Sequence, residues 1–223
     1  FPQQIKMLYD ETGRDITIKG RQTRASTLKL ARRLRRFVTG QVWGANCLVA
    51  ADTDPTTAIF REKIQHWIQD LKRHDLVVNI SLDNADEMVI KEFQNRFVWG
   101  SGEHKVLGRG YAIQECHLSE FAHWQAAAIS HVGSILPAVP GAPVGRVDIE
   151  STPKGESGAF WKYATTARPH NPHDLWTVHL YPWWLEPRYR VTDDPLAGCD
   201  ILLPHTEYVD LSRSFRPSDY EAK

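Results

Sequence analysis

A strand, a short turn and a helix follow one another between Ile16 and Thr27, and this order of elements constrains the fold most strongly. The turn follows a β-branched run and contains Gly20. It ends in the hydroxyl pair Ser26 and Thr27, which opens a strongly periodic helical segment. Such a turn directs backbone N–H groups at one spot beside the positive end of a helix, which favours anions. The stretch therefore predicts a phosphate-binding loop.

The loop departs from the common pattern G-x-x-x-x-G-K-[ST], which has a second glycine and a lysine beside the hydroxyl residue. Arg24 and Ala25 stand at these two places. Positive charge comes instead from Lys19, Arg21 and Arg24. Taken alone, the pattern also fits an ordinary strand-turn-helix with a serine N-cap, so the loop itself leaves that alternative open.

The composition is that of a globular protein with no overall preference for nucleic acid. Of 223 residues, 42% are hydrophobic and 24% charged, and 27 basic residues balance 27 acidic ones. Any DNA-binding surface must then be a local patch. Cys47, Cys116 and Cys199 lie far apart, which indicates free thiols in a reducing compartment. No apolar run reaches the roughly 20 residues of a membrane span, so no membrane association is expected.

Helical and strand-like patterns alternate along the chain, which predicts an α/β fold with a mainly parallel central β-sheet flanked by helices. Helical spacing of apolar residues predicts helices over 26–38, 55–71, 121–131 and 159–164. Strand patterns fall at 47–51, 77–93, 96–99, 111–120, 144–150 and 176–180.

The first of these helices carries a run of basic side chains, which are Lys29, Arg32, Arg33, Arg35 and Arg36. Since charged residues on one side of an amphipathic helix normally face water, we expect a solvated basic face. Contact with nucleic acid or phosphate is the alternative.

Polar residues stand at the ends of three expected strands: Lys19–Thr27, Ser119–Glu120 and Ser151–Thr152. Ligands of parallel α/β sheets bind beyond the carboxyl ends of the strands. If these strands are neighbours, the three segments converge on one crevice.

Such a crevice suits phosphoryl transfer, which needs a phosphate cradle, an oxygen ligand for Mg²⁺, a carboxylate that orients water and positive charge. Glu120 would orient the water. Arg21, Arg24 or Arg109 would supply the charge.

Four motifs in order resemble those of the large terminase subunits of tailed bacteriophages, the ATPases that package viral DNA. Lys19–Thr27 is similar to the variant phosphate loop of that family, with lysine at the front followed by an Arg-Gln pair. Gly108–Gly110 followed by His117–Trp124 resembles the second ATPase motif and its lead-in. Gly145–Gly155 is similar to the motif that couples hydrolysis to DNA movement, and Gln4 fits the adenine-recognition glutamine.

The resemblance implies a P-loop NTPase domain of the RecA-like (ASCE) type over residues 1–168. Residues 169–223 would then be the end of this domain and a linker region toward a C-terminal nuclease domain. That nuclease domain is not recognisable in the sequence, so nuclease activity is not expected.

The resemblance also assigns roles to single residues. The ATP-binding residues it implies are Gln4, Lys19, Gly20, Arg21, Gln22, Thr23, Arg24, Ala25, Ser26 and Thr27. The catalytic residues it implies are Glu120, Arg21 and Arg109, with Arg109 acting across a subunit boundary. Ser151 and Thr152 would couple hydrolysis to movement, and Mg²⁺ would be held by Ser26 or Thr27, with Ser119 as a weaker ligand.

Two residues depart from the family pattern. Arg24 replaces the second glycine of the loop, which is expected to hinder close approach of a phosphate. Ser119 replaces the aspartate that commonly precedes the catalytic glutamate, so metal binding would depend on the loop hydroxyls and water.

The partners that the resemblance implies are double-stranded DNA, a portal protein, a small terminase subunit and further copies of the chain in a ring on the capsid. The site of action would be the host cell cytoplasm, at the procapsid. Two alternatives stay open. One is a helicase-like nucleic-acid ATPase, and the other is a DNA- or portal-binding assembly module that has lost turnover.

Overall fold

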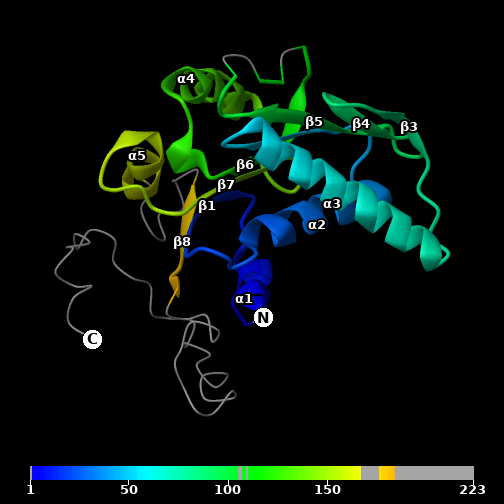
Figure 1. Ribbon diagram of the computed structural model, residues 1–223, viewed down its shortest axis with the longest axis horizontal. Coiled ribbons are helices and arrows are strands. Elements are labelled where there is room, and N and C mark those ends of the chain that lie inside the picture. Colours follow the sequence, from blue (N-terminus) through cyan, green and yellow to red (C-terminus); the bar gives the residue numbers. More distant parts are fainter. Residues whose placement is uncertain (1, 105–106, 109, 167–175, 184–223) are drawn as a thin grey trace.

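The computed structural model describes residues 2–104, 107–108, 110–166 and 176–183. Its helices cover both faces of a single β-sheet of eight strands (Figure 1). None of the helices in these ranges combines the length and the apolar content that crossing a membrane requires.

The elements begin with α1 (Pro2–Asp10), β1 (Arg14–Lys19), α2 (Ala25–Val38), β2 (Asn46–Ala51) and α3 (Asp54–Arg73). They continue with β3 (Ile80–Asp83), β4 (Glu87–Ile90), β5 (Asn95–Ser101), β6 (Ile113–Ser119) and the 3₁₀ turn η1 (Phe121–His123). The last are α4 (Ala126–Ile135), η2 (Leu136–Ala138), β7 (Arg146–Ser151), α5 (Gly158–Thr166) and β8 (Thr177–Tyr181).

The strand order is β3-β4-β5-β2-β6-β7-β1-β8. Every pairing from β5 to β8 is parallel, whereas β4 runs antiparallel to both β3 and β5. The predicted α/β fold with a mainly parallel sheet is therefore confirmed. β8 pairs with β1, so a strand beyond residue 168 completes the sheet.

Side chains alternate between the two faces of the sheet because the side-chain period of a strand is two. On β2, Cys47, Val49 and Ala51 pack in the core with α2 and α3. Leu48 and Ala50 belong to the second core, with α4, η1 and α5. Figure 1 shows these two helix layers on opposite sides of the sheet.

Two predicted elements have different bounds in the structure. Instead of one helix over 121–131, η1 ends at His123, and the extended backbone of Trp124 and Gln125 separates it from α4. The Trp124 indole N–H donates to the Ser119 carbonyl, which keeps this ring in the core and interrupts the helix. Of the strand run expected over 77–93, only β3 and β4 form, and Val77 is exposed.

The expectation of a solvated basic face on α2 is wrong for two of its residues. Lys29 and Arg33 are buried against the sheet and form ion pairs with carboxylates of three other segments. Asp148 of β7 pairs with both cations, Glu115 of β6 pairs with Arg33, and Glu11 pairs with Lys29. Because an unpaired buried charge is strongly unfavourable, these contacts orient α2 on the sheet.

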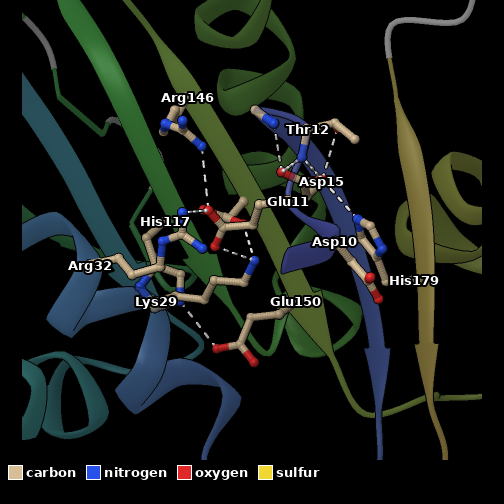
Figure 2. Close-up of polar contacts among 12 residues, drawn as sticks. Asp10, Glu11, Thr12, Asp15, Lys29, Arg32, His117, Arg146, Glu150 and His179 are labelled. Carbon is tan, nitrogen blue, oxygen red and sulfur yellow. Dashed lines mark hydrogen bonds and ion pairs between the residues drawn. The ribbon is translucent and has the colours of Figure 1, made fainter. Parts of the chain in front are cut away.

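Glu11 also connects the buried ion pairs of α2 to two more exposed cations, Arg32 and Arg146. Figure 2 shows Lys29, Arg32 and Arg146 converging on its carboxylate, at 3.0, 2.8 and 3.3 Å. Nearby, Asp15 of β1 accepts hydrogen bonds from the Thr12 backbone N–H and interacts with His179 of β8 at 2.7 Å (Figure 2).

We expect Asp148→Asn to lower the free energy of unfolding by about 3–5 kcal/mol at pH 7, because it leaves two buried cations with one carboxylate fewer. Urea unfolding measures this change. The control is Asp70→Asn, which breaks an exposed pair with Arg73 and should change stability by less than about 0.5 kcal/mol. Equal effects of the two variants would contradict the role given to the buried layer.

The stability loss in Asp148→Asn should depend on pH. Burial alone would raise the pKa of Asp148, but the charges of Arg33 and Lys29 offset this and hold the pKa well below its usual range. A lowered pKa in the folded state gives stability that is present at neutral pH and is lost as the pH falls below about 4. The stability difference between the parent protein and Asp148→Asn should therefore shrink as the pH falls from about 5 to about 2.5.

Candidate functional site

The three polar strand ends meet, as the sequence predicts. β6, β7 and β1 are adjacent and parallel in the sheet, so their carboxyl ends lie at one edge. The Lys19 ammonium lies 2.7 Å from Glu120 Oε1. The Thr152 backbone N–H and hydroxyl donate to Glu120 Oε2 at 3.1 and 3.0 Å. One carboxylate thus links the ends of all three strands.

Lys19 is a buried cation held by two carboxylates. Its side chain is 6% exposed, and Glu150 Oε2 lies 3.4 Å from its ammonium in addition to Glu120. Burial alone would lower the pKa of Lys19, but the charges of Glu150 and Glu120 raise it above its ordinary value. Lys19 therefore stays charged, as a phosphate-binding lysine must.

The backbone of Glu120 adopts the left-handed conformation, with φ 53°. Such a conformation costs an L-residue about 1–2 kcal/mol and persists only where surrounding contacts enforce it. Those contacts come from Thr152 and from Ser151, whose hydroxyl accepts the Ala122 backbone N–H at 3.1 Å and lies 3.5 Å from Glu120 Oε2. The predicted coupling residues thus hold the predicted catalytic carboxylate directly.

The loop between β1 and α2 contains two further left-handed residues, Gln22 with φ 56° and Arg24 with φ 58°. Arg24 thus has the backbone conformation that glycine adopts without strain, at the place where the common loop pattern has glycine. Gly20 is required for another reason. A Cβ at position 20 would lie 2.8 Å from the Trp183 Cβ, so only glycine fits without a shift. The Gly20 backbone N–H also donates to the Tyr181 carbonyl at 3.0 Å, which ties the loop to β8.

The other predicted loop residues divide by exposure. Arg21, Gln22 and Arg24 are exposed, whereas Thr23 and Ala25 are buried. The Thr23 hydroxyl donates to the Gly20 carbonyl at 3.4 Å, so it serves the loop itself.

Gln4 of α1 reaches the same loop, since its amide donates to the Arg24 carbonyl at 3.4 Å. The contact places the residue predicted to recognise adenine beside the predicted phosphate loop. Arg109, predicted to be catalytic, lies outside the described residues.

The two candidate metal hydroxyls point in different directions. Ser26 Oγ lies 3.4 Å from Ser119 Oγ at the end of β6. Thr27 Oγ1 instead accepts a hydrogen bond from Lys63 of α3 at 3.3 Å. The structure therefore brings Ser26 and Ser119 together at the site and turns Thr27 away from them.

Sequence reasoning missed Glu150 and His117. Both are fully buried, and His117 Nε2 lies 3.2 Å from Glu150 Oε1. Burial alone would raise the pKa of Glu150, but Lys19 and the hydrogen bond with His117 lower it to about 2. A signal was available, because Glu115, His117 and Ser119 on one strand alternate with apolar residues, as do Asp148 and Glu150 on the next.

The left-handed backbone at Arg24 predicts that glycine is favoured there over alanine. Arg24→Gly and Arg24→Ala both remove the side chain, so their difference isolates the backbone. After the entropy of the unfolded chain is subtracted, the glycine variant should be more stable by about 0.5–1 kcal/mol in urea unfolding. At the exposed helical position Ala31 the order should reverse, with Ala31→Gly losing about 1 kcal/mol. The same order at both positions would contradict this account.

No protein-family model matches the sequence, and no curated protein does either. Solved structures do match. The large terminase ATPase domain of Thermus phage P74-26 aligns with a TM-score of 0.61 and 15% identity, over 85% of this chain and 88% of that chain. The large terminase of bacteriophage HK97 aligns with a TM-score of 0.66 and 16% identity, over 81% of this chain and 39% of that chain.

The large terminase of a thermophilic bacteriophage, in complex with ADP, aligns with a TM-score of 0.59 and 12% identity, over 80% of this chain and 44% of that chain. At identities this low, the likeness concerns the arrangement of the backbone. The chain therefore shares the fold of phage large terminase ATPase domains.

Proposed function

We propose that this chain is the ATPase motor domain of a viral terminase large subunit, which hydrolyses ATP with Mg²⁺ to move double-stranded DNA into a procapsid. The observation that carries the proposal is the convergence of Lys19, Glu120 and Thr152 at the ends of three adjacent strands. The structural likeness to terminase ATPase domains supports it. So does the large terminase of the thermophilic bacteriophage, which has been solved with ADP and with ATP-γ-S.

The nucleotide phosphates would be bound by the Lys19 ammonium and by the backbone of the loop from Gly20 to Ser26. Gln4 would contact the adenine, and Arg21, exposed in the loop, would add charge near the phosphates. A buried lysine at the end of a strand is suited to this task because the low local dielectric strengthens its attraction for phosphate.

The residues present fit a Mg²⁺ ion bound with the nucleotide. No group of three metal-ligating His, Cys, Asp or Glu side chains occurs in the described ranges, but Mg²⁺ typically uses one or two carboxylates, water and substrate phosphates. Ser26 and Ser119 offer hydroxyls, and the buried carboxylate of Glu150 lies beside them. When bound, Mg²⁺ neutralises charge that develops on the phosphates.

Glu120 is the group that would orient the attacking water. Its side chain is 25% exposed, so water has access to it. Phosphate competes with Glu120 for Lys19, so nucleotide binding would loosen the Lys19–Glu120 ion pair and leave the carboxylate for water. Thr152 keeps hold of the other carboxylate oxygen, which connects the catalytic group to the segment after β7.

The wider assembly follows from the same proposal. Double-stranded DNA, a portal protein, a small terminase subunit and further copies of the chain in a ring would be its partners, at the procapsid in the host cytoplasm. Arg109 would act across a subunit boundary of that ring, and Ser151 and Thr152 would transmit the product state to the surface that grips DNA.

Two substitutions separate binding from chemistry. Glu120→Gln should lower Mg²⁺-dependent ATP hydrolysis by about 10²–10⁴-fold while nucleotide binding persists, because it removes the base but keeps the shape. Lys19→Ala should abolish nucleotide binding. Hydrolysis is measured by phosphate release with and without duplex DNA, and binding by a fluorescent ADP analogue. Glu62→Gln and Lys72→Ala, at exposed positions, are the matched controls.

The outcomes distinguish the rival functions. Strand separation by the parent protein would favour a helicase-like ATPase. Binding of DNA or portal protein without nucleotide binding would favour an assembly module. If the parent protein hydrolyses ATP and Glu120→Gln does so equally well, the assigned role of Glu120 is wrong.

Thr152→Val removes the hydroxyl that donates to Glu120 but leaves the backbone N–H in place. We expect hydrolysis to fall about tenfold, in line with the loss of roughly 1.4 kcal/mol of positioning energy, with unchanged nucleotide affinity. The matched control is Thr166→Val on α5, because the Thr166 hydroxyl donates to carbonyls of its own helix. Loss of nucleotide affinity in Thr152→Val would argue against a positioning role.

A further inference from the structure

The acidic group that P-loop NTPases use to hold Mg²⁺ is absent from its usual place in this chain. In those enzymes an aspartate at the end of the strand binds the metal together with the loop hydroxyl. Here Ser119 precedes Glu120, and its hydroxyl faces that of Ser26 at 3.4 Å. The loop hydroxyl is in position, but the strand that should supply the carboxylate does not.

The neighbouring strand supplies one at the same level. In the parallel pairing of β6 and β7, Ser119 is the register partner of Glu150. Both belong to the polar face that lies against α2, because each is two residues beyond another buried polar residue, His117 or Asp148.

Glu150 has one carboxylate oxygen that an ion pair with Lys19 holds without a hydrogen bond. Oε1 contacts His117 Nε2 at 3.2 Å. Within the described part of the chain Oε2 takes part in no hydrogen bond, and its nearest charged neighbour is the Lys19 ammonium at 3.4 Å. Buried carboxylate oxygens are normally hydrogen-bonded or bound to a cation, so this oxygen is suited to another cation once Lys19 turns to a phosphate.

The local charge also favours a cation. Lys19 brings one positive charge, while Glu120 and Glu150 bring two negative charges within 3.4 Å of it. When Lys19 turns to a phosphate, the His117 contact at Oε1 remains, and Oε2 loses its cationic partner. The Ser26 hydroxyl is one of the neighbouring groups that lower the pKa of Glu150.

We propose that Glu150, reaching across from β7, supplies the acidic group of the Mg²⁺ site in place of the residue before Glu120, and binds either the metal or a water on it together with Ser26. This inference rests on the proposed ATPase function. It assigns to Glu150 a role beyond that of an ion-pair partner for Lys19.

The test is the Mg²⁺ dependence of binding of a fluorescent ADP analogue, which needs no turnover. We expect Glu150→Gln to bind the analogue without metal within about twofold of the parent protein. Its apparent Mg²⁺ affinity should be at least about tenfold weaker, since one charged ligand group is lost. Ser119→Asp/Glu150→Gln, which moves the carboxylate to the usual strand, should restore the Mg²⁺ response.

Asp15→Asn is the matched control, because it removes another buried carboxylate, at the end of β1 that lies away from Lys19. It should lower thermal stability without weakening Mg²⁺ binding. If Glu150→Gln does not fold, the Ser119→Asp/Glu150→Gln variant is compared directly with the parent protein. A Mg²⁺ response like that of the parent supports the proposal, and a weak response overturns it.

The failures are distinguishable. Equal Mg²⁺ responses in the parent protein and Glu150→Gln would overturn this inference and leave the ATPase proposal standing, with Glu150 acting only as a partner of Lys19. A parent protein that binds no nucleotide, with or without Mg²⁺, would overturn both proposals.

Discussion

The buried ion pairs between α2 and the sheet are the interactions on which the rest of the structure depends. Arg33 and Lys29 enter a layer that also holds Asp148 and Glu115, and all four side chains are buried. Charges buried in this way are tolerated only when each has a partner. Rotating or sliding α2 would separate the pairs, so they determine where the N-terminus of α2, and with it Ser26, lies relative to the strands.

The candidate site is the open end of this same layer. Along β7 the polar face runs from Asp148 to Glu150, and along β1 it ends at Lys19. Exposure rises from 0% at the Glu150 side chain to 6% at Lys19 and 25% at Glu120. The inner charges are therefore fixed by pairing, while the outer carboxylate meets solvent and can exchange partners. That gradient separates the groups proposed to hold a ligand from the group proposed to orient water.

Three of the five non-glycine residues with a left-handed backbone in the described ranges lie at the same place, while Asp75 and Gln94 lie elsewhere. Gln22, Arg24 and Glu120 all have left-handed conformations without being glycine. The neighbouring structure enforces the conformation on both sides of the site, since α2 begins directly after Arg24 and Thr152 binds the carboxylate of Glu120. An arginine at a position of glycine-like geometry shows that the path of the loop is set by the strand before it and the helix after it.

Much of the fold could be predicted from local patterns. Alternating helix and strand signals predicted the mainly parallel sheet, and polar residues at strand ends predicted which segments would meet. The break in the helix expected over 121–131 could not be predicted from local patterns. It depends on the Trp124 ring, which tertiary packing and the Ser119 carbonyl hold in the core. The burial of Arg33 was equally out of reach, because its partner Asp148 lies 115 residues away in the chain.

By itself, then, the sequence determined the order of elements, the strand-turn-helix around Gly20, and the positions of Lys19 and Glu120 at strand ends, since these depend on local periodicity and residue type. The tertiary structure alone decided that Glu150 stands beside Ser119, that Thr152 holds Glu120, and that the basic residues Lys29 and Arg33 face inward. The physical reason is that strand register and helix docking bring together side chains whose pairing energies exist only when distant segments are packed.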